Sequence, residues 1–394
     1  MIYDVIIIGG GPSGLMASIN ASKKYKNVLL IEKNKGLGKK LLASGNGRCN
    51  VTNVKTNNDF IKNVQSSNSK FLLSSLSEFG PWDIYDFFCD NNCLLKEEDD
   101  NRVFPISDNS KDILDVLVNH LSNVEIKLEE SVIDVTKKED FIVNTDKGCY
   151  KAKKVVLSTG GKSYPTLGTT GDGYEILKRF ELNIVNPLPA LTSLNSNESF
   201  IKDNILLGIT LPNCRVSYNN KSVEGNVLFT HFGVSGPGIF KISEDVVRSL
   251  LNSKEEFIYI DMLEDSLEEI LDQASNNPNN TIGSLFKGQI NKVIKYLLKE
   301  YENKKISSIS NKLLIELINK FKQFKISIYD SKGFKTAFVT SGGLSLEEVN
   351  PKTMEVKKVE GLFVTGELLD LHAYTGGYNI TIALSTGYKA GNSV

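Results

Sequence analysis

The stretch VIIIGGGPSGL (residues 5–15) decides the fold at the start of this chain. Val5–Ile8 is a β-branched run typical of a buried parallel strand. Three glycines end that run, and Pro12 suits the first turn of a helix, where its missing N–H costs nothing. A second apolar strand follows at Val28–Ile31. The pattern therefore predicts a strand–helix–strand unit with parallel strands.

The glycines of this stretch follow the pattern G-x-G-x-x-G. Gly9 permits the tight turn, Gly11 lets backbone N–H groups approach a pyrophosphate, and Gly14 lets the helix lie close to the strand. The helix N-terminus offers unpaired donors and partial positive charge to the phosphates. Glu32 lies 18 residues after Gly14 and can accept hydrogen bonds from ribose hydroxyls. The spacing indicates a dinucleotide site; the alternative is a glycine turn that binds nothing.

Further glycine-rich strand ends favour FAD over NAD. FAD is the longer ligand and needs contacts from remote segments, which Thr159-Gly160-Gly161 and Thr365-Gly366-Glu367 can supply. Gly376-Gly377 opens the last predicted helix, whose N-terminus would stabilise negative charge on a reduced flavin. Each glycine pair taken alone is explained by a packing turn. Together with the N-terminal pattern, the pairs favour a flavin.

Composition sets the class of protein. The chain has 394 residues, 40% of them hydrophobic, and 46 basic against 47 acidic residues give a net charge of −1. These values exclude general disorder and suggest two or three globular domains. Balanced charge gives no support for a nucleic-acid partner, although local basic patches are compatible with it. Five cysteines at irregular spacings do not form a disulfide framework, which fits a reducing compartment.

Several other classes of function find no support in the sequence. The start of the chain lacks a secretory signal, and no apolar run is long enough for a membrane helix, so we expect a soluble cytoplasmic protein with no membrane partner. The chain has three histidines, with no HExxH and no CxxC, which predicts no metal site. The oligomeric state is left open.

The middle of the chain looks like an insertion between two ends of one α/β domain. The residue patterns predict mostly helix over 60–121 with a loop near 97–105, short strands over 124–157, a helical segment over 264–322, a strand at 361–366 and a final helix at 378–390. Between them, short β-like runs occur near 205–211, 214–218, 226–231 and 257–262.

The chain resembles the aminoacetone-oxidase and BaiN-like (YhiN-like) group of FAD-dependent oxidoreductases. The motifs that carry the resemblance extend from one end of the chain to the other. They are VIIIGGGPSGLMAS (5–18), EKNKGLGKKLLASGNGRCNVTN (32–53), RVFP (102–105), STGGKSYPTLGTTGDGY (158–174), LFTHFGVSGPGIF (228–240), FVTSGGLSLEEVNPKTME (338–355) and GLFVTGELLDLHAYTGGYNITIALSTGYKAG (361–391). Residues around 265–325 match no motif of the group.

The resemblance implies an α/β fold in which a Rossmann-like FAD-binding domain with a parallel sheet is split by an insertion. The expected parts are an FAD domain at 1–190 and 338–394, an inserted β-barrel-like domain at 191–262 and 323–337, and a small helical domain at 263–322.

The resemblance also implies which residues hold FAD. It places Ser13 at the pyrophosphate and Glu32 at the ribose. Backbone of Val132 contacts adenine, and other residues lie along the cofactor or at its flavin end: Lys33, Lys39, Lys40, Arg48, Cys49, Asn50, Gly366, Glu367, Asn379 and Ile380. From residue reasoning we add Gly9, Gly11, Gly14, Thr159, Gly160, Gly161 and Gly377.

Three polar residues beside glycine or proline turns are candidates for catalysis: His231, Tyr164 and Arg102. A hydrogen-bonded loop anchor is the alternative for each. The resemblance implies an FAD-dependent oxidoreductase acting on a small organic substrate, by amine oxidation or by reduction of a conjugated double bond, and leaves NAD(P)H open as electron donor. An RNA-modifying flavoenzyme and a non-catalytic flavin-binding regulatory protein are the alternatives. No nucleic-acid partner is expected.

Overall fold

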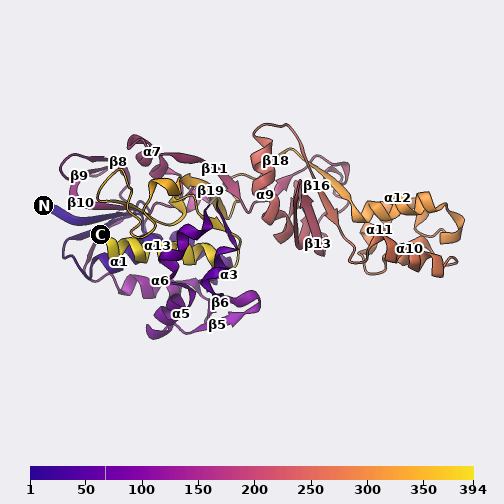
Figure 1. The fold of residues 1–394 in the computed structure, drawn as a ribbon, viewed down its shortest axis with the longest axis horizontal. Helices are drawn as coiled ribbons and strands as arrows, with labels where there is room; N and C mark the ends of the chain where they lie inside the picture. The colour runs from indigo at the N-terminus through magenta and orange to yellow at the C-terminus, as the bar shows by residue number, and fades with distance from the viewer. Residues whose placement is uncertain (67) are drawn as a thin grey trace. The chain divides into compact units, whose positions relative to one another are not determined.

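The computed structural model describes residues 1–66 and 68–394. The chain divides into two compact units (Figure 1), the first formed by Met1–Pro189 with Phe338–Val394 and the second by Ala190–Ala337. The first unit is therefore built from both ends of the chain. Among the described residues, none of the helices combines the length and the apolar character that crossing a membrane requires.

The first unit begins with the strand–helix–strand unit that the sequence predicts. Strand β1 spans Ile2–Ile8, helix α1 Pro12–Ala21 and strand β2 Val28–Ile31. All four residues of β2 are buried. The continuous apolar character of both strands follows from their position inside a sheet that is covered on both faces.

A mixed seven-stranded sheet forms the centre of the first unit, in the order β7-β2-β1-β10-β9-β8, with β20 paired to β10. Strands β7, β2, β1, β10 and β20 run parallel, whereas β9 is antiparallel to both of its neighbours, β10 and β8. Because parallel strands end at one edge, the segments after β1, β2, β10 and β20 meet there. The bounds of the strands not yet given are β7 Val124–Lys127, β8 Val132–Lys137, β9 Phe141–Thr145, β10 Cys149–Leu157 and β20 Leu362–Val364.

The last helix, α13 (Tyr378–Ser393), packs directly on α1 (Figure 1). Glycines allow this close approach: a Cβ added to Gly387 would lie 2.2 Å from the carbonyl oxygen of Ser13, and one added to Gly391 would lie 2.5 Å from that of Ala17. The end of the chain therefore supports the helix that follows the glycine loop.

The prediction of mostly helix over 60–121 is wrong in part. Strands β5 (Leu95–Glu98) and β6 (Arg102–Pro105) form an antiparallel hairpin where the sequence suggests a loop. Strand β6 also pairs with β3 (Thr52–Asn53), about fifty residues earlier. That pairing buries Val103 and Phe104, an effect that no local pattern reveals. The other short elements are α2 Lys39–Ala43, α3 Asn57–Ile61, β4 Val64–Gln65, α4 Leu73–Leu76, α5 Pro81–Asp90, α6 Ser110–Asn119, α7 Asp172–Arg179, β11 Ile184–Ala190, β19 Val339–Leu344 and β21 His372–Ala373.

The second unit is built on another seven-stranded sheet, in the order β17-β16-β13-β14-β15-β12-β18. Its two edge strands, β17 (Phe324–Ile328) and β18 (Asp330–Ser331), follow each other in the chain, so the sheet curls toward closure. Helix α9 (Pro237–Leu250) packs against it. The remaining elements are β12 Leu194–Asn195, α8 Ser199–Lys202, β13 Thr210–Tyr218, β14 Lys221–Phe229, β15 Gly233–Ser235 and β16 Glu256–Asp261.

Two features of the second unit bear on the sequence patterns. The β-like run at 205–211 is mostly a turn, because Asn204 and Gly208 adopt positive φ and interrupt an extended chain.

Three α-helices lie between β16 and β17, with Phe286 and Phe321 stacked at 4.0 Å between ring centroids in their core. These helices are α10 Leu267–Asn276, α11 Asn291–Leu298 and α12 Asn311–Lys322.

Candidate functional site

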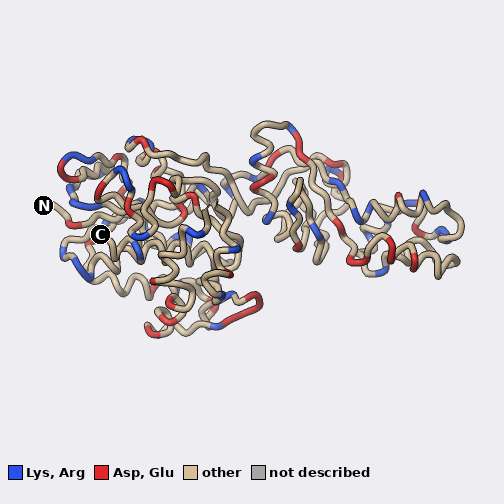
Figure 2. Tube along the Cα trace, in the orientation of Figure 1, with Lys and Arg blue, Asp and Glu red and all other residues tan. Residues whose placement is uncertain are grey.

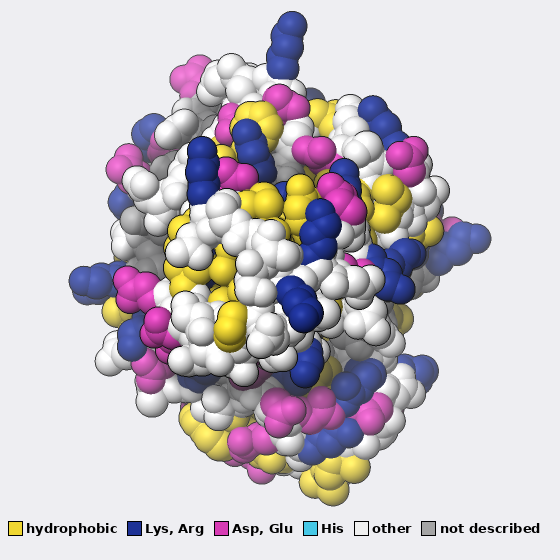
Figure 3. Space-filling view, turned by 90° about the vertical axis from the view of Figure 1, so that its right-hand side faces the viewer, with side chains coloured by type: hydrophobic (Ala, Val, Ile, Leu, Met, Phe, Trp, Pro, Cys, Tyr) yellow, Lys and Arg dark blue, Asp and Glu magenta, His cyan; other side chains and the backbone are white. Residues whose placement is uncertain are grey.

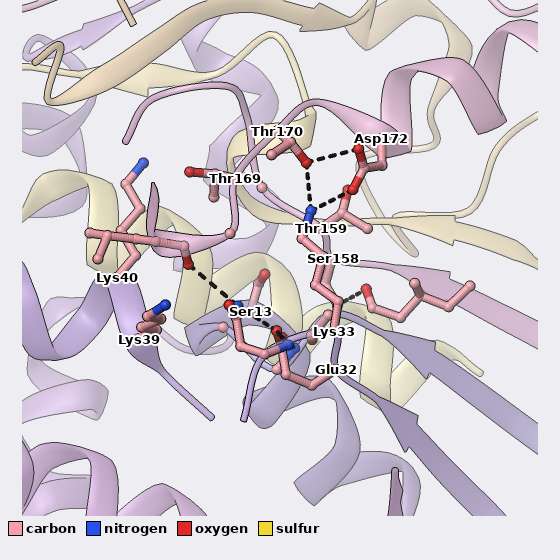
Figure 4. Close-up of a pocket in the computed structure, with 18 of the residues that line it drawn as sticks. Ser13, Glu32, Lys33, Lys39, Lys40, Ser158, Thr159, Thr169, Thr170 and Asp172 are labelled. Atoms are coloured by element: carbon pink, nitrogen blue, oxygen red, sulfur yellow. Dashed lines mark hydrogen bonds and ion pairs between the residues drawn. The ribbon is translucent and has the colours of Figure 1, made fainter. Parts of the chain in front are cut away.

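A cavity opens at the carboxyl edge of the parallel strands in the first unit (Figure 4). Segments far apart in the sequence form its walls: the glycine loop after β1, the end of β2, the start of α2, the end of β10 and a turn before α7. Its lining comprises residues 8–13, 31–34, 38–40, 130, 132, 158–160, 167–170, 172, 176, 367 and 383.

The three glycines of the loop have different surroundings. A Cβ on Gly14 would lie 1.9 Å from the carbonyl oxygen of Gly9, and one on Gly9 would lie 2.5 Å from that of Ser158. A Cβ on Gly11 would meet no atom within 4 Å. Gly9 and Gly14 are thus required by the packing of the protein itself, whereas the open space beside Gly11 faces the cavity and is available to a ligand.

Helix α1 points its N-terminus into this space. Gly11 is its N-cap residue, and no side chain caps it. Leu15 donates the first backbone hydrogen bond of the helix, to the Gly11 carbonyl at 2.9 Å. The preceding N–H groups have no acceptor within the helix, and together with the helix dipole they favour an anion.

Glu32 joins the end of β2 to the glycine loop. Its Oε2 accepts a hydrogen bond from the Gly10 N–H at 2.7 Å, and its Oε1 accepts from the backbone and side-chain nitrogens of Asn34 at 2.8 and 2.7 Å. The carboxylate is 8% exposed and lines the cavity. An ionised carboxylate has about four acceptor positions, so it retains capacity for a ligand hydroxyl.

Three lysines reach the cavity from two sides. Figure 4 places Lys39 and Lys40 on one side and Asp172 with its partners on the other. Lys33 pairs with Asp172 at 2.5 Å, and Lys40 pairs with Glu367 at 2.7 Å. Lys39 donates to a backbone carbonyl at 3.3 Å. The cavity therefore carries basic groups on both sides, two of them held by carboxylates.

Asp172 is kept ionised by its neighbours. Burial raises its pKa, but hydrogen bonds from Lys33 and Thr170 outweigh that effect and bring the pKa below its ordinary value. The carboxylate thus stays charged at neutral pH. This pair ties the segment after β2 to the start of α7.

The end of β10 supplies the facing wall. Ser158 Oγ donates to the carbonyls of Ile8 at 2.9 Å and Gly9 at 3.1 Å, which fixes the glycine loop against the strand. The neighbouring Thr159 hydroxyl oxygen is buried and has no hydrogen-bond partner among the described residues. Buried polar atoms are normally satisfied, so this one suggests a missing ligand group.

Glu367, which follows β20, connects the cavity to β19. Its Oε1 accepts from the Thr340 N–H at 2.7 Å while its Oε2 holds Lys40. Tyr174 donates its hydroxyl to the Glu367 carbonyl at 3.3 Å. Burial, and then the charges of Glu367 and Asp370, raise the pKa of Tyr174 well above its ordinary value. Tyr174 therefore acts as a neutral donor that fixes this turn.

The structure brings about half of the predicted cofactor residues to the cavity and places the others behind it. The lining includes Gly9, Gly11, Ser13, Glu32, Lys33, Lys39, Lys40, Val132, Thr159, Gly160 and Glu367. The predicted residues outside the lining are Gly14, Arg48, Cys49, Asn50, Gly161, Gly366, Gly377, Asn379 and Ile380.

The residues behind the cavity have structural partners. A Cβ on Gly366 would lie 2.8 Å from Ser13 Oγ, and one on Gly377 would lie 2.3 Å from the Thr52 carbonyl. Asn379 exchanges two hydrogen bonds with the backbone of Ala373, at 2.8 and 2.9 Å. Burial raises the pKa of Cys49 to about 12, so this thiol stays protonated.

Arg48 belongs to a separate cluster. It pairs with Glu98 and with Asp108, the latter at 2.6 Å, and its guanidinium lies 4.1 Å from the centre of the Phe104 ring. Hydrogen bonds with the two carboxylates raise the pKa of Arg48. The cluster ties the segment after α2 to the β5–β6 hairpin.

The three catalytic candidates lie in different places. Tyr164 caps the turn whose next residues, 167–170, line the cavity, and burial raises the pKa of its phenol. Arg102 is in β6, where its Nε donates to the Asp99 carbonyl at 2.8 Å. His231 is exposed in the second unit, with its ring edge-on to Phe232. None of the three is among the cavity-lining residues.

The sequence patterns passed over several residues that line the cavity, among them Gly10, Asn34, Ser158, Thr170 and Asp172. Gly10 stands between two glycines already assigned, and a Cβ there would lie 2.4 Å from a Leu37 methyl carbon. The others are single polar residues without a spacing rule. The glycine-rich run 168–173 is the signal in the sequence that could have identified this turn.

Comparisons with known proteins give one family. The family model described as "HI0933-like protein Rossmann domain" matches residues 3–393. A ribosomal RNA dihydrouridine synthase of Escherichia coli is 31% identical over 98% of this chain and 96% of its own length. A 3-dehydro-bile acid delta(4,6)-reductase of Clostridium scindens is 30% identical over 98% of each chain.

One solved structure extends the comparison to the fold. A flavocytochrome c3 fumarate reductase in an open conformation is 16% identical, with a TM-score of 0.50 over 100% of this chain and 78% of that one. At this identity the similarity concerns the arrangement of the chain alone.

Proposed function

Because this chain belongs to the HI0933-like family of FAD-dependent oxidoreductases, we propose that it reduces a carbon–carbon double bond conjugated to a carbonyl group, with NAD(P)H as the electron donor. One observation carries the proposal: a single cavity joins the glycine loop, Glu32 and the Lys40–Glu367 pair. A long dinucleotide needs contacts of this kind at both its ends.

The residues of the cavity fit FAD. The open side of Gly11 and the uncapped start of α1 suit a pyrophosphate, and the Glu32 carboxylate suits ribose hydroxyls. The unpartnered Thr159 hydroxyl suits a polar group of the cofactor. We propose that Lys33, Lys39 and Lys40 balance the phosphate charge, and that the residues behind the cavity hold its walls in place.

The names of the two relatives share one chemistry. Making dihydrouridine saturates a ring double bond that is conjugated to a carbonyl, and a delta(4,6)-reductase of a 3-dehydro compound acts on double bonds conjugated to a ketone. Both reactions add a hydride to one carbon and a proton to its neighbour. This common step, rather than amine oxidation, is what we propose for the present chain.

The protein must supply the proton. Hydride transfer is the chemistry that bound FAD contributes. We propose Tyr164 as the acid, because its phenol stays protonated at neutral pH and its turn continues into the cavity wall. Its backbone carbonyl accepts from Leu167 N–H at 2.8 Å, which fixes the turn. A positioned acid of this kind contributes roughly 100- to 10,000-fold to rate.

The experiment follows the flavin colour under anaerobic conditions. NADH or NADPH is added first, and then a 3-oxo-4-ene steroid, a uridine-rich RNA oligonucleotide or a primary amine. We expect a nicotinamide to bleach the flavin and the steroid or the RNA to restore its colour much faster than it restores free reduced flavin.

Two results would contradict the proposal. Bleaching of oxidised flavin by the amine, with no acceptor restoring the colour, would identify an amine oxidase. Recovery at the rate of free flavin with every acceptor would instead support a flavin-binding protein without turnover.

A further inference from the structure

The charges of the second unit are separated along the chain. Residues 255–272 carry eight acidic and no basic residues, whereas residues 287–335 carry twelve lysines and four acidic residues. Figure 2 marks acidic residues along the chain at α10 and basic residues around α11 and α12. The net charge of −1 for the whole chain averages over this separation and conceals a strongly basic segment.

Many of these lysines face solvent. Figure 3, which looks onto the helical end of this unit, shows lysine and arginine side chains standing out from it. Lys292, Lys295, Lys299, Lys305 and Lys312 are exposed. Exposed lysines attract a polyanion, and in this segment twelve lysines outnumber four acidic residues.

The basic segment includes strand β17. Its paired strand β16 belongs to the acidic stretch 255–272 and carries exposed aromatic rings. Strand β16 alternates strictly: Ile258 and Ile260 are fully buried, whereas Phe257 is 36% and Tyr259 is 40% exposed. The paired strand β17 places Lys325 opposite Tyr259. We call Phe257, Tyr259 and Lys325 the outer β16–β17 face.

The cation and the rings of this face are already in contact. Lys325 Nζ lies 3.7 Å from the centre of the Phe257 ring, within the range of a cation–π interaction. On the other side of β16, strand β13 pairs Ser217 with Tyr259 and Arg215 with Asp261. Arg215 is 61% exposed, and the acidic residue near it, Glu224, is 3.8 Å away and itself 77% exposed. Together with Arg215 on the neighbouring strand β13, the face combines two aromatic rings with two cations.

The acidic residues beside the face are engaged in other contacts. Glu255 accepts a hydrogen bond from Ser327, and Glu256 accepts from the Tyr218 hydroxyl at 2.8 Å. Asp261 pairs with Lys322 at 2.8 Å, which anchors α12 to β16. Within the described part of the chain, none of these carboxylates forms an ion pair with Lys325.

We propose that the outer β16–β17 face binds single-stranded RNA, with Phe257 and Tyr259 stacking on bases and Lys325 and Arg215 contacting phosphates. Exposed aromatic rings on a sheet, flanked by cations, are what unpaired bases and their phosphates require. The lysines of 287–335 supply the complementary charge. This inference rests on the proposed function, and it names RNA uridine as the substrate class of that reduction.

The test measures RNA binding apart from turnover. A fluorescein-labelled single-stranded oligouridylate is titrated with the FAD-loaded protein, and anisotropy is followed at several salt concentrations. We expect Phe257→Ala/Tyr259→Ala to raise Kd at least tenfold, because losing one stacking ring costs roughly five- to 150-fold. Lys325→Gln should reduce the slope of log K against log salt by about 0.7.

The matched control is Trp82→Ala, which removes a more exposed ring (51%) from α5 in the first unit. It should leave Kd unchanged. The proposal is overturned if the parent protein fails to bind the oligonucleotide, if the double variant binds like the parent, or if the control weakens binding as much. It is also overturned if the double variant changes only self-association in light scattering, since the face would then be a protein contact.

Reduction of the steroid acceptor by the same variants separates this inference from the proposed function. Parent and double variant should reduce it equally well. Normal steroid reduction without RNA binding removes the RNA face and leaves the reductase. RNA binding through the face without reduction of any acceptor removes the reductase and leaves the face.

Discussion

The two units of the molecule keep their chemically active residues in opposite places. In the first unit, glycines, lysines and carboxylates surround a cavity at the edge of a parallel sheet. In the second unit, aromatic rings and lysines stand on the outer surface of a curled sheet. The comparison suggests a division of labour, in which the first unit holds the cofactor and the second contacts a large substrate. The predictions below test that division.

The largest effect should come from filling the open side of Gly11. Its φ of −81° suits any residue, and an added Cβ meets no protein atom within 4 Å. Gly11→Val should therefore leave the melting temperature of the apoprotein unchanged. It should weaken FAD binding by roughly 100-fold, the upper end of an overpacking cost, when measured by flavin fluorescence titration.

Gly36→Val is the matched control, because a Cβ there also meets no atom and the residue lies outside the cavity lining. Equal FAD affinity in both variants would mean that the cofactor does not pass over Gly11. The role of the first unit would then need another explanation.

Tyr164→Phe in the first unit and His231→Ala in the second test which unit supplies the proton. We expect roughly 100-fold slower flavin reoxidation by the acceptor, with unchanged flavin reduction by NAD(P)H, since only the acceptor step needs an acid. His231→Ala in the second unit should keep its flavin and slow the same step less, by under tenfold. Stopped-flow absorbance measures both steps. A larger effect in the histidine variant would move the acid to the second unit.

Glu32→Ala should weaken FAD binding about ten- to 100-fold, because hydrogen bonds to a charged group contribute about 1.5–3 kcal/mol. It also leaves the Gly10 N–H without its acceptor, so a lower melting temperature is expected. Glu32→Gln keeps one acceptor oxygen, so its FAD affinity should lie between those of the parent protein and Glu32→Ala. If both variants retain the flavin of the parent protein, Glu32 only supports the loop.

The smallest effect concerns the Arg48 cluster. Hydrogen bonds from Arg48 and Lys96 hold the pKa values of Glu98 and Asp108 below their ordinary values. The stability they contribute is present above the unfolded-state values near pH 4 and is lost as the pH falls through the folded-state values. Arg48→Gln should lower the apparent melting temperature by roughly 1–3 °C at pH 7.

Calorimetry across pH checks this sign, since the difference between Arg48→Gln and the parent should shrink below about pH 4. A loss of FAD comparable to that of Glu32→Ala would instead give Arg48 a direct part in the cofactor site.

The sequence predicts the parallel strands of the first unit correctly because their residues carry the signal themselves. Val5–Ile8 and Val28–Ile31 are continuous apolar runs; glycines end the first where the chain must turn, and Glu32 follows the second. The β3–β6 pairing joins Thr52 to Val103, and no window of local sequence contains both residues. The hairpin at 95–105 was therefore missed.

The same distinction applies to the site. Gly11 and Glu32 were predicted because each stands at a fixed distance from a strand end. Asp172 acts through Lys33, which only the folded chain brings near it. Asn34 donates to Glu32, two residues before it, a local contact for which no spacing rule exists. Arg48 matched a family motif, yet it pairs with Glu98 in the hairpin and with Asp108 just after it.

The glycine-mediated contact between α1 and α13 also sets an order for biosynthesis. A ribosome releases the nucleotide loop first and the helix that supports it last, after the whole insertion has emerged. The second unit has its complete sheet before β20 and α13 leave the exit tunnel. Cofactor capture is therefore a late event, and chains truncated before Gly387 should emerge colourless even when their inserted unit is folded.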